Sequence, residues 1–179
     1  MIQSKQKYAR KNPTALYVCH GTIHDKKQKY TLDIRQEAKP LILADITNKP
    51  DLKRYYKHFD KAILEYCPFH VYATPNIDYE IFDDAENGNY FLVRKKDKKR
   101  VPVYFKPNLQ TFLNIYQILK KDGLVYIPNW YLIEMYTTEK NIKNTISNFL
   151  KPIKGLFKFK NRIQTSKSPL DITLILQKI

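Results

Sequence analysis

The apolar residues of this chain follow two different spacings, and the spacing changes at residues 106–108. Before this point the apolar stretches are short and separated by polar turns, a pattern typical of β-strands. After it, residues such as Leu109 and Phe112 recur at the spacing of an α-helix. The sequence therefore predicts an α+β protein in two parts, residues 1–106 and residues 107–179.

The first part is expected to contain mainly antiparallel strands. Segments 14–24 and 30–35 are rich in β-forming residues, and the polar run 25–29 between them predicts a hairpin. Further on, Asn87-Gly88 is a strong turn signal. It lies among four short apolar runs that together predict a β-meander: 69–74, 77–82, 90–94 and 101–105.

One amphipathic helix is expected within the same part, over residues 50–66. Pro50 suits the first turn of a helix because its missing N–H has no partner there. Tyr55, Phe59 and Ile63 then follow one another at intervals of four residues, which would place them on a single apolar face.

After residue 107 the expected order is helix, short strand, helix, helix, strand, polar loop and strand. The helices are expected at 109–122, 128–136 and 138–151, and the last two strands at 155–160 and 172–176. This is the order of a winged helix. In that arrangement the last helix enters the major groove of DNA, and the loop of the hairpin contacts neighbouring phosphates.

The distribution of charge supports a polyanionic partner for the second part. The chain contains 32 basic and 17 acidic residues, a net charge of +15. Residues 1–89 hold 14 basic and 12 acidic side chains, whereas residues 90–179 hold 18 and 5. The two halves therefore carry +2 and +13, and a field concentrated in one half favours nucleic acid.

The candidate nucleic-acid-binding residues are basic or polar side chains on the third helix, on the wing and in a dense basic turn. They are Lys140, Lys143, Asn144, Ser147 and Lys151 on the helix, Lys158, Lys160, Arg162 and Lys167 on the wing, and Arg94, Lys95, Lys96, Lys98, Lys99 and Arg100 in the turn. Lysine and asparagine can donate hydrogen bonds to phosphates and base edges.

These observations favour a non-catalytic nucleic-acid-binding protein with a regulatory, replication-accessory or mobile-element (phage) role. Double-stranded DNA is favoured over RNA, and the nearly neutral first part is available for homodimer formation or for a protein partner. No cofactor or metal is expected, because the sequence contains no P-loop, dinucleotide fingerprint or zinc-ligand spacing.

Two other functions fit the same residues. In the first, the lysine-rich face docks onto an acidic protein, and the chain acts as an inhibitor or adaptor of a nucleic-acid enzyme. In the second, the acidic cluster at 78–86 binds a divalent metal in a nuclease, with Asp78, Glu80 and Asp83 as ligands.

The expected location is the cytoplasm. No apolar run approaches the ~18 residues of a membrane span. Two cysteines do not form a disulfide framework, which agrees with a reducing compartment.

Overall fold

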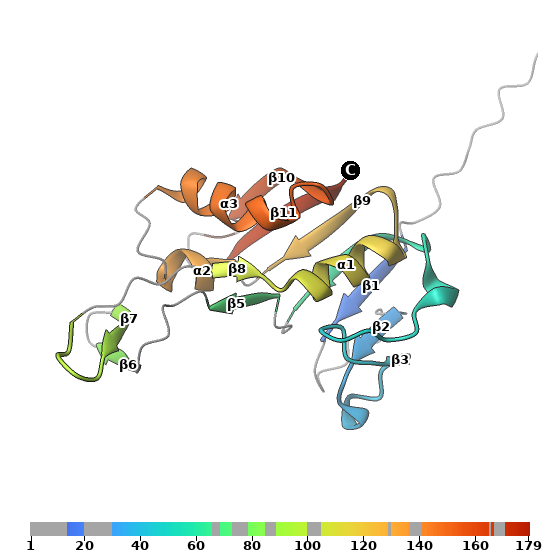
Figure 1. The fold of residues 1–179 in the computed structure, drawn as a ribbon. Coiled ribbons are helices and arrows are strands. Elements are labelled where there is room, and N and C mark those ends of the chain that lie inside the picture. Colours follow the sequence, from blue (N-terminus) through green and yellow to red (C-terminus); the bar gives the residue numbers. More distant parts are fainter. Residues whose placement is uncertain are drawn as a thin grey trace, which may run out of the picture.

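A seven-stranded sheet forms the centre of the molecule (Figure 1). The computed structural model describes residues 14–19, 30–65, 69–72, 79–84, 89–99, 105–128, 130–136, 141–164, 166 and 171–179. The strands of the central sheet are β1 (Ala15–Val18), β2 (Tyr30–Asp33), β3 (Ile42–Leu43), β4 (Phe59–Leu64), β9 (Leu119–Ile127), β10 (Phe157–Gln164) and β11 (Ile172–Lys178).

The strands lie in the order β3-β2-β1-β4-β9-β11-β10, and most of their pairings are parallel. Strands β3, β2, β1, β4 and β9 all run in the same direction. Strand β11 is antiparallel to both of its neighbours, β9 and β10. Four of the seven strands come from residues 1–106 and three from residues 107–179, so both predicted parts contribute to one sheet.

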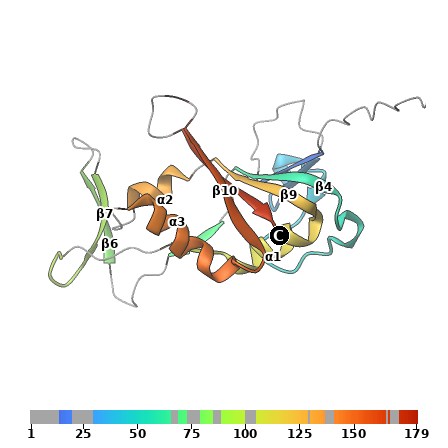
Figure 2. The same cartoon turned by 90° about the horizontal axis from the view of Figure 1, so that it is seen from above.

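The two longer helices cover the same face of this sheet (Figures 1 and 2). They are α1 (Leu109–Ile118) and α3 (Ile142–Leu150). The ring of Phe112 on α1 lies 6.0 Å from that of Phe149 on α3 and 5.8 Å from that of Phe157 on β10, in edge-to-face contacts. These aromatic contacts join both helices to the antiparallel end of the sheet.

Alternation along the strands explains why one face is fully covered and the other is not. Leu16, Ala62 and Val125 are cross-strand neighbours, belong to the main core and are fully buried. The residues next to them point to the opposite face. Tyr17, Ile63 and Tyr126 are also cross-strand neighbours there, and they are only half-buried.

Helix α1 is held at both ends by side chains. At its start the Asn108 side chain accepts a hydrogen bond from the Thr111 N–H at 3.2 Å. At its end the buried Lys178 Nζ donates to the carbonyls of Tyr116 at 2.6 Å and Leu119 at 2.8 Å. Burial, and to a lesser extent the charge of Lys57, lowers the pKa of Lys178. A cation is favourable at this position because the carboxyl end of a helix carries partial negative charge.

Smaller elements complete the fold. A two-stranded sheet pairs β5 (His70–Tyr72) with β8 (Phe105–Pro107), and another pairs β6 (Tyr79–Asp84) with β7 (Asn89–Arg94). The short helices are α2 (Tyr131–Tyr136) and the 3-10 turns η1 (Gln36–Ala38), η2 (Lys53–Tyr55) and η3 (Lys151–Ile153).

The predicted winged helix is wrong. The antiparallel hairpin of β10 and β11 exists, but β11 also pairs with β9 and so belongs to the central sheet. A wing must project from the surface, whereas Leu174 and Leu176 of β11 are fully buried in the core. The α+β class with antiparallel strands in the first part is likewise replaced by a mostly parallel sheet.

Three local predictions in the first part are also wrong. Strands β1 and β2 are parallel neighbours, so they do not form a hairpin. The described part of the predicted helix, residues 50–65, contains η2 and strand β4 in place of a helix, because β4 lies between β1 and β9 and is buried there. The meander forms only in its middle pair, because β6 and β7 pair as antiparallel neighbours but β5 pairs with β8.

Several local predictions in the second part are confirmed. Helices α1, α2 and α3 occur where helical spacing indicates them, and β11 occupies the predicted terminal strand. Gly123 is the exception, since it lies within β9 and does not end a helix. A Cβ atom at Gly123 would lie 3.0 Å from the Lys120 carbonyl oxygen and 3.3 Å from that of Asp60, so this irregular pairing favours glycine, because the backbone would have to shift to accept a side chain.

None of the helices in the described ranges is both long and apolar enough to cross a membrane. A cytoplasmic location stays a prediction.

The carboxylate of Asp60 joins the amino-terminal ends of three strands, and we expect it to make stability depend on pH. It accepts hydrogen bonds from the Thr14 N–H at 2.7 Å and from Lys120 Nζ at 2.9 Å. Burial raises the pKa of Asp60, but these hydrogen bonds outweigh burial and leave it below its ordinary value. The resulting stabilisation is present above the unfolded pKa of about 3.9 and is lost as pH falls through the lower folded value.

Asp60→Asn should therefore lower the free energy of unfolding at pH 7 by up to about 1 kcal/mol, since the ion pair is partly exposed. The difference from the unchanged protein should shrink towards pH ~3, as measured by urea denaturation. Asp51→Asn, at an exposed carboxylate, serves as the control. A difference that stays constant with pH would contradict this role of Asp60.

Candidate functional site

The strand order reverses between β1 and β4. From β1 the chain proceeds outward through β2 and β3, and it then returns to the other side of β1 to form β4. In open parallel sheets, ligands bind outside the carboxyl ends of the strands at such a reversal, because the connections on its two sides diverge there. The candidate site is therefore the edge where β1, β2 and β4 end.

Backbone hydrogen bonds hold these strand ends together. The Cys19 N–H donates to the Leu32 carbonyl at 2.7 Å, which ties the end of β1 to β2. The Glu65 N–H donates to the Val18 carbonyl at 3.2 Å, which ties the end of β4 to β1. Cys19 has φ of 57°, in the left-handed region, so the chain turns sharply as it leaves β1.

Three of the parallel strands, β2, β3 and β4, have a carboxylate at or just beyond their carboxyl end. Asp33 is the last residue of β2, Asp45 follows β3 by two residues, and Glu65 follows β4 directly. Because the strands are parallel and adjacent, these carboxylates lie along one edge of the sheet. We name Cys19, Asp33, Asp45 and Glu65 the acidic edge.

Asp33 is the most buried member of the acidic edge, with 1% of its surface exposed. Its carboxylate accepts hydrogen bonds from Arg35 at the backbone N–H (2.9 Å), Nε (3.2 Å) and Nη2 (3.3 Å). These hydrogen bonds with Asp33 raise the pKa of the Arg35 guanidinium, and smaller contributions come from Glu37 and Cys19. Arg35 is itself 45% exposed, so its side chain can leave Asp33 without disturbing the core.

Asp45 has a more local role. Its Oδ1 accepts hydrogen bonds from the Thr47 N–H at 2.9 Å and from Thr47 Oγ1 at 2.7 Å, which closes a turn after β3. Within the described ranges, no group of three or more histidine, cysteine or acidic residues could hold a metal ion. The chemistry that the acidic edge offers is therefore hydrogen-bond acceptance and attraction of positive charge.

The connection between β1 and β2 lacks the glycines of a phosphate-binding loop. Residues 19–29 contain one glycine, Gly21, whereas a dinucleotide fingerprint has three at fixed spacing. Only Cys19 of this connection lies in the described ranges.

The residues predicted from the sequence for nucleic-acid contact lie on other surfaces. Lys143, Asn144 and Ser147 are exposed on α3, Lys151 is exposed on η3, and Lys158 and Lys160 are exposed on β10. In the basic turn, Lys95, Lys96, Lys98 and Lys99 are exposed, Arg94 pairs with Asp97 at 3.0 Å, and Lys98 pairs with Glu80. Arg100, Lys140 and Lys167 lie outside the described residues. Binding of nucleic acid by this set stays a prediction.

The proposed nuclease ligands do not form a described cluster. Asp78 lies outside the described residues, as does the side chain of Asp83. Glu80 is paired with Lys98.

The acidic edge was not identified from the sequence, although one signal for it was present. Each of the apolar runs ending at Leu32, Ala44 and Leu64 is followed at once by an acidic residue. This recurrence identifies a site only if the three runs are parallel strands in one sheet. Because antiparallel strands were predicted from the sequence, the recurrence was not recognised as a site.

The hypothesis of a non-catalytic protein that binds duplex DNA through a winged helix is wrong. It depended on α3 and the β10–β11 hairpin acting as a recognition helix and a free wing. The hairpin is part of a central sheet that has a reversal point between parallel strands, and such sheets carry their ligands at that point.

No protein-family profile and no curated protein sequence matches this chain. Three similar solved structures are methyltransferases. A putative S-adenosyl-L-methionine-dependent methyltransferase from Methanococcus maripaludis is 13% identical, with a TM-score of 0.48, and the match covers 93% of this chain and 77% of that one.

A 16S rRNA (adenine(1408)-N(1))-methyltransferase from Catenulisporales acidiphilia is 8% identical, with a TM-score of 0.48 and coverage of 93% and 84%. The N-methyltransferase NodS from Bradyrhizobium japonicum, in complex with S-adenosyl-L-homocysteine, is 9% identical, with a TM-score of 0.45 and coverage of 93% and 76%. At these scores and identities the similarity by itself shows neither a family nor a function.

Arg162 was predicted to contact nucleic acid, but the structure gives it an internal partner. Its Nε and Nη2 each donate to the Glu134 carboxylate at 2.7 Å, which joins β10 to α2. The hydrogen bonds with Glu134 raise the pKa of Arg162. The pair is largely buried, with side-chain exposures of 25% and 12%.

Arg162→Ala should therefore lower the free energy of unfolding by about 1–3 kcal/mol, because it leaves a shielded carboxylate without its partner. Lys160→Ala, on the same strand but exposed, should change it by less than about 0.5 kcal/mol. Chemical denaturation measures both variants, and equal effects would contradict the structural role of Arg162.

Proposed function

We propose that this protein binds a positively charged ribonucleoside cofactor, S-adenosyl-L-methionine, at the acidic edge and transfers its methyl group to a substrate. The observation that carries this proposal is the reversal of strand order at β1 and β4 with the Asp33 carboxylate at the end of the neighbouring strand β2. The carboxyl ends of parallel strands at such a reversal are the usual place for a nucleotide-type ligand.

Asp33 is suited to bind the ribose. A vicinal diol donates two hydrogen bonds, and a carboxylate accepts two at once through its two oxygens. In the structure the Arg35 guanidinium occupies both Asp33 oxygens with parallel hydrogen bonds. The diol would replace the guanidinium there, while the Arg35 backbone N–H at 2.9 Å would continue to orient the carboxylate.

The charges at the edge favour a cationic cofactor over a phosphate-bearing one. The chain as a whole carries +15, yet Asp33, Asp45 and Glu65 lie at the carboxyl ends of three parallel strands along one edge of the sheet. Carboxylates repel a pyrophosphate, and residues 19–29 lack the glycine pattern that a pyrophosphate needs. The sulfonium and ammonium groups of S-adenosyl-L-methionine have the complementary sign.

Isothermal titration of the protein with S-adenosyl-L-methionine tests this proposal. We expect Asp33→Asn to weaken binding at least about tenfold, because the amide replaces an acceptor by a donor and removes charge-assisted hydrogen bonds. Asp60→Asn provides a matched control, since it makes the same chemical change at the opposite ends of the strands and should leave binding unchanged.

Thermal unfolding of both variants without ligand separates loss of fold from loss of binding. No binding by the folded, unchanged protein would overturn the proposal. Preferential binding of NAD, which carries a pyrophosphate, would overturn it as well.

Nucleic acid is the methyl acceptor that we propose, and the surface charge supports it. Eight of the basic residues predicted from the sequence are exposed: Lys95, Lys96, Lys98, Lys99, Lys143, Lys151, Lys158 and Lys160. A net charge of +15 attracts polyanions over the range of the electrostatic field.

Fluorescence anisotropy with a labelled RNA and a labelled DNA duplex tests whether nucleic acid binds. The residues to change are Lys158 and Lys160, on the outermost strand β10. Affinity should fall steeply with salt. Replacing both lysines by glutamine should reduce the slope of log affinity against log salt by about 1.4–1.8, the release of two counterions. The same change at the exposed lysines Lys53 and Lys121 is the control. Binding that is insensitive to salt would contradict this assignment.

A further inference from the structure

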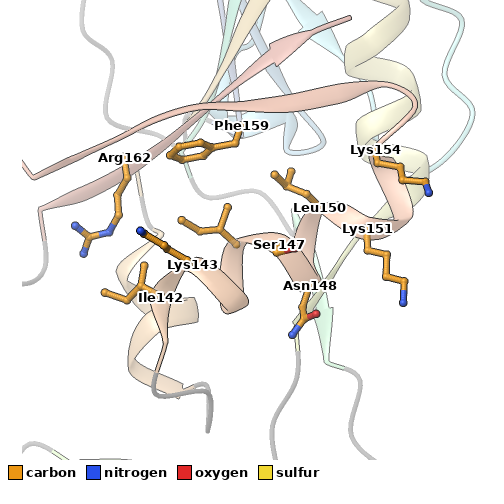
Figure 3. Close-up of a pocket in the computed structure, with 10 residues that line it drawn as sticks. Ile142, Lys143, Ser147, Asn148, Leu150, Lys151, Lys154, Phe159 and Arg162 are labelled. Atoms are coloured by element: carbon orange, nitrogen blue, oxygen red, sulfur yellow. The ribbon is translucent and has the colours of Figure 1, made fainter.

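A groove lies between α3 and β10, far along the sheet from the acidic edge (Figure 3). Its volume is about 1010 Å³. Ile142, Ile146 and Leu150 follow one another at intervals of four residues, so they form an apolar stripe along α3. Phe159 of β10 reaches into the groove from the other side.

Part of this apolar lining is exposed. Ile142 is 43% exposed and Phe159 is 47% exposed, although both are large apolar side chains. Side chains of this kind that gather around one groove mark a binding surface, because isolated exposed apolar residues are common but contiguous ones are not.

The rim of the groove is basic. Lys143, Lys151 and Lys154 are exposed around the apolar stripe, and none of the residues that line the groove is acidic. No ion pair involving these three lysines is found within the described ranges. The fourth cation of the lining, Arg162, is paired with Glu134.

Strand β10 forms one end of the central sheet. Among the described strands only β11 pairs with it, so its outer edge carries backbone groups without a strand partner. The register shifts between Phe159 and Asn161, where the strand is irregular. Backbone groups along a strand edge can pair with another chain, and here the irregularity confines regular pairing to the parts of β10 on either side of it, while the lysines of the strand favour an acidic partner over a basic one.

We propose that this groove binds an extended acidic segment of a partner protein, which pairs with the outer edge of β10. In such strand addition, main-chain hydrogen bonds supply affinity, and alternate side chains enter a groove beside the edge. Apolar side chains of the segment would contact Phe159 and the stripe on α3. Its acidic side chains would lie near Lys143, Lys151 and Lys154.

The residues of the groove favour this occupant over two others. A second copy of the chain would bring Lys158, Lys160 and Arg162 of β10 against the same residues, and β10 contains no acidic residue to offset the repulsion. Single-stranded nucleic acid binds through aromatic stacking platforms, whereas the lining contains three aliphatic side chains and one aromatic ring.

Fluorescence anisotropy with a labelled peptide that alternates valine with glutamate tests the proposal. The 179-residue protein should bind this peptide and should not bind a peptide with lysine in place of glutamate. Phe159→Ala should weaken binding at least about fivefold, as expected for a central apolar anchor. Lys143→Glu with Lys154→Glu should weaken it at least about tenfold, whereas Lys53→Glu with Lys121→Glu should not.

Two further probes test strand addition itself. Two peptides are needed, one methylated on the odd-numbered backbone nitrogens and one on the even-numbered ones. Their affinities should differ, because only one of the two sets of nitrogens makes the hydrogen bonds to β10. Equal binding of both methylated peptides, or no binding of the valine–glutamate peptide, would overturn the proposal. The proposal would also be overturned if oligothymidylate bound to the groove more tightly than the valine–glutamate peptide. Dimers of the protein that dissociate on Phe159→Ala would overturn it as well.

The variants lie outside the acidic edge, so titration of each one with S-adenosyl-L-methionine reports the proposed cofactor binding separately from peptide binding. Thermal unfolding confirms that each variant is folded. Phe159→Leu, which keeps an apolar side chain, should retain most of the peptide binding that Phe159→Ala loses.

Discussion

The pairing of β4 between β1 and β9 is the constraint on which the rest of the structure depends. It brings residues 59–64 beside residues 15–18 on one side and beside residues 124–126 on the other. Residues 15–18 precede the change in apolar spacing at residues 106–108, and residues 124–126 follow it. A parallel pair cannot be closed by a tight turn, so the chain between β4 and β9 must cross over. That crossover contains α1, which covers the sheet and contributes Phe112 and Ile115 to the core.

The same pairing creates the candidate site. Because β4 returns to the far side of β1, the strand order reverses there and the connections diverge. The carboxylates that follow β2, β3 and β4 then come to one edge of the sheet. The groove beside β10 has a different origin, since it lies between α3 and the strand at the antiparallel end of the sheet. The two sites therefore lie at distinct places in one fold, with opposite charge.

Local patterns predicted local structure better in the second part of the chain than in the first. Helix α1 was predicted from the spacing of its apolar residues and the Asn108 cap, and the cap hydrogen bond is present. The β10–β11 hairpin was predicted from two β-like runs on either side of a polar loop, and its strands pair as expected. Strand β4 was mistaken for a helix because Tyr55, Phe59 and Ile63 happen to be four residues apart. In the structure Phe59 and Ile63 belong to a strand and differ in burial, so their spacing does not define one helix face.

The candidate site was missed for a related reason. Asp33 and Glu65 each follow an apolar run, but they are 32 residues apart in the sequence. Nothing in the sequence between them shows that β2 and β4 lie on either side of β1. The basic residues were easier to find because charge is visible in the sequence. Their partners were not, and Arg162 illustrates this, since it meets Glu134 across 28 residues.

The sequence by itself determined the helices after residue 108, the terminal hairpin and the concentration of positive charge in the second half. These follow from side-chain spacing and composition, which are properties of neighbouring residues. Only the tertiary structure decided that β1, β2, β3, β4 and β9 are parallel, that the strand order reverses at β1, and that β11 enters the central sheet. Each of these depends on apolar surfaces distant in the chain being buried together, and the free energy of that burial belongs to the assembled core, not to any one segment.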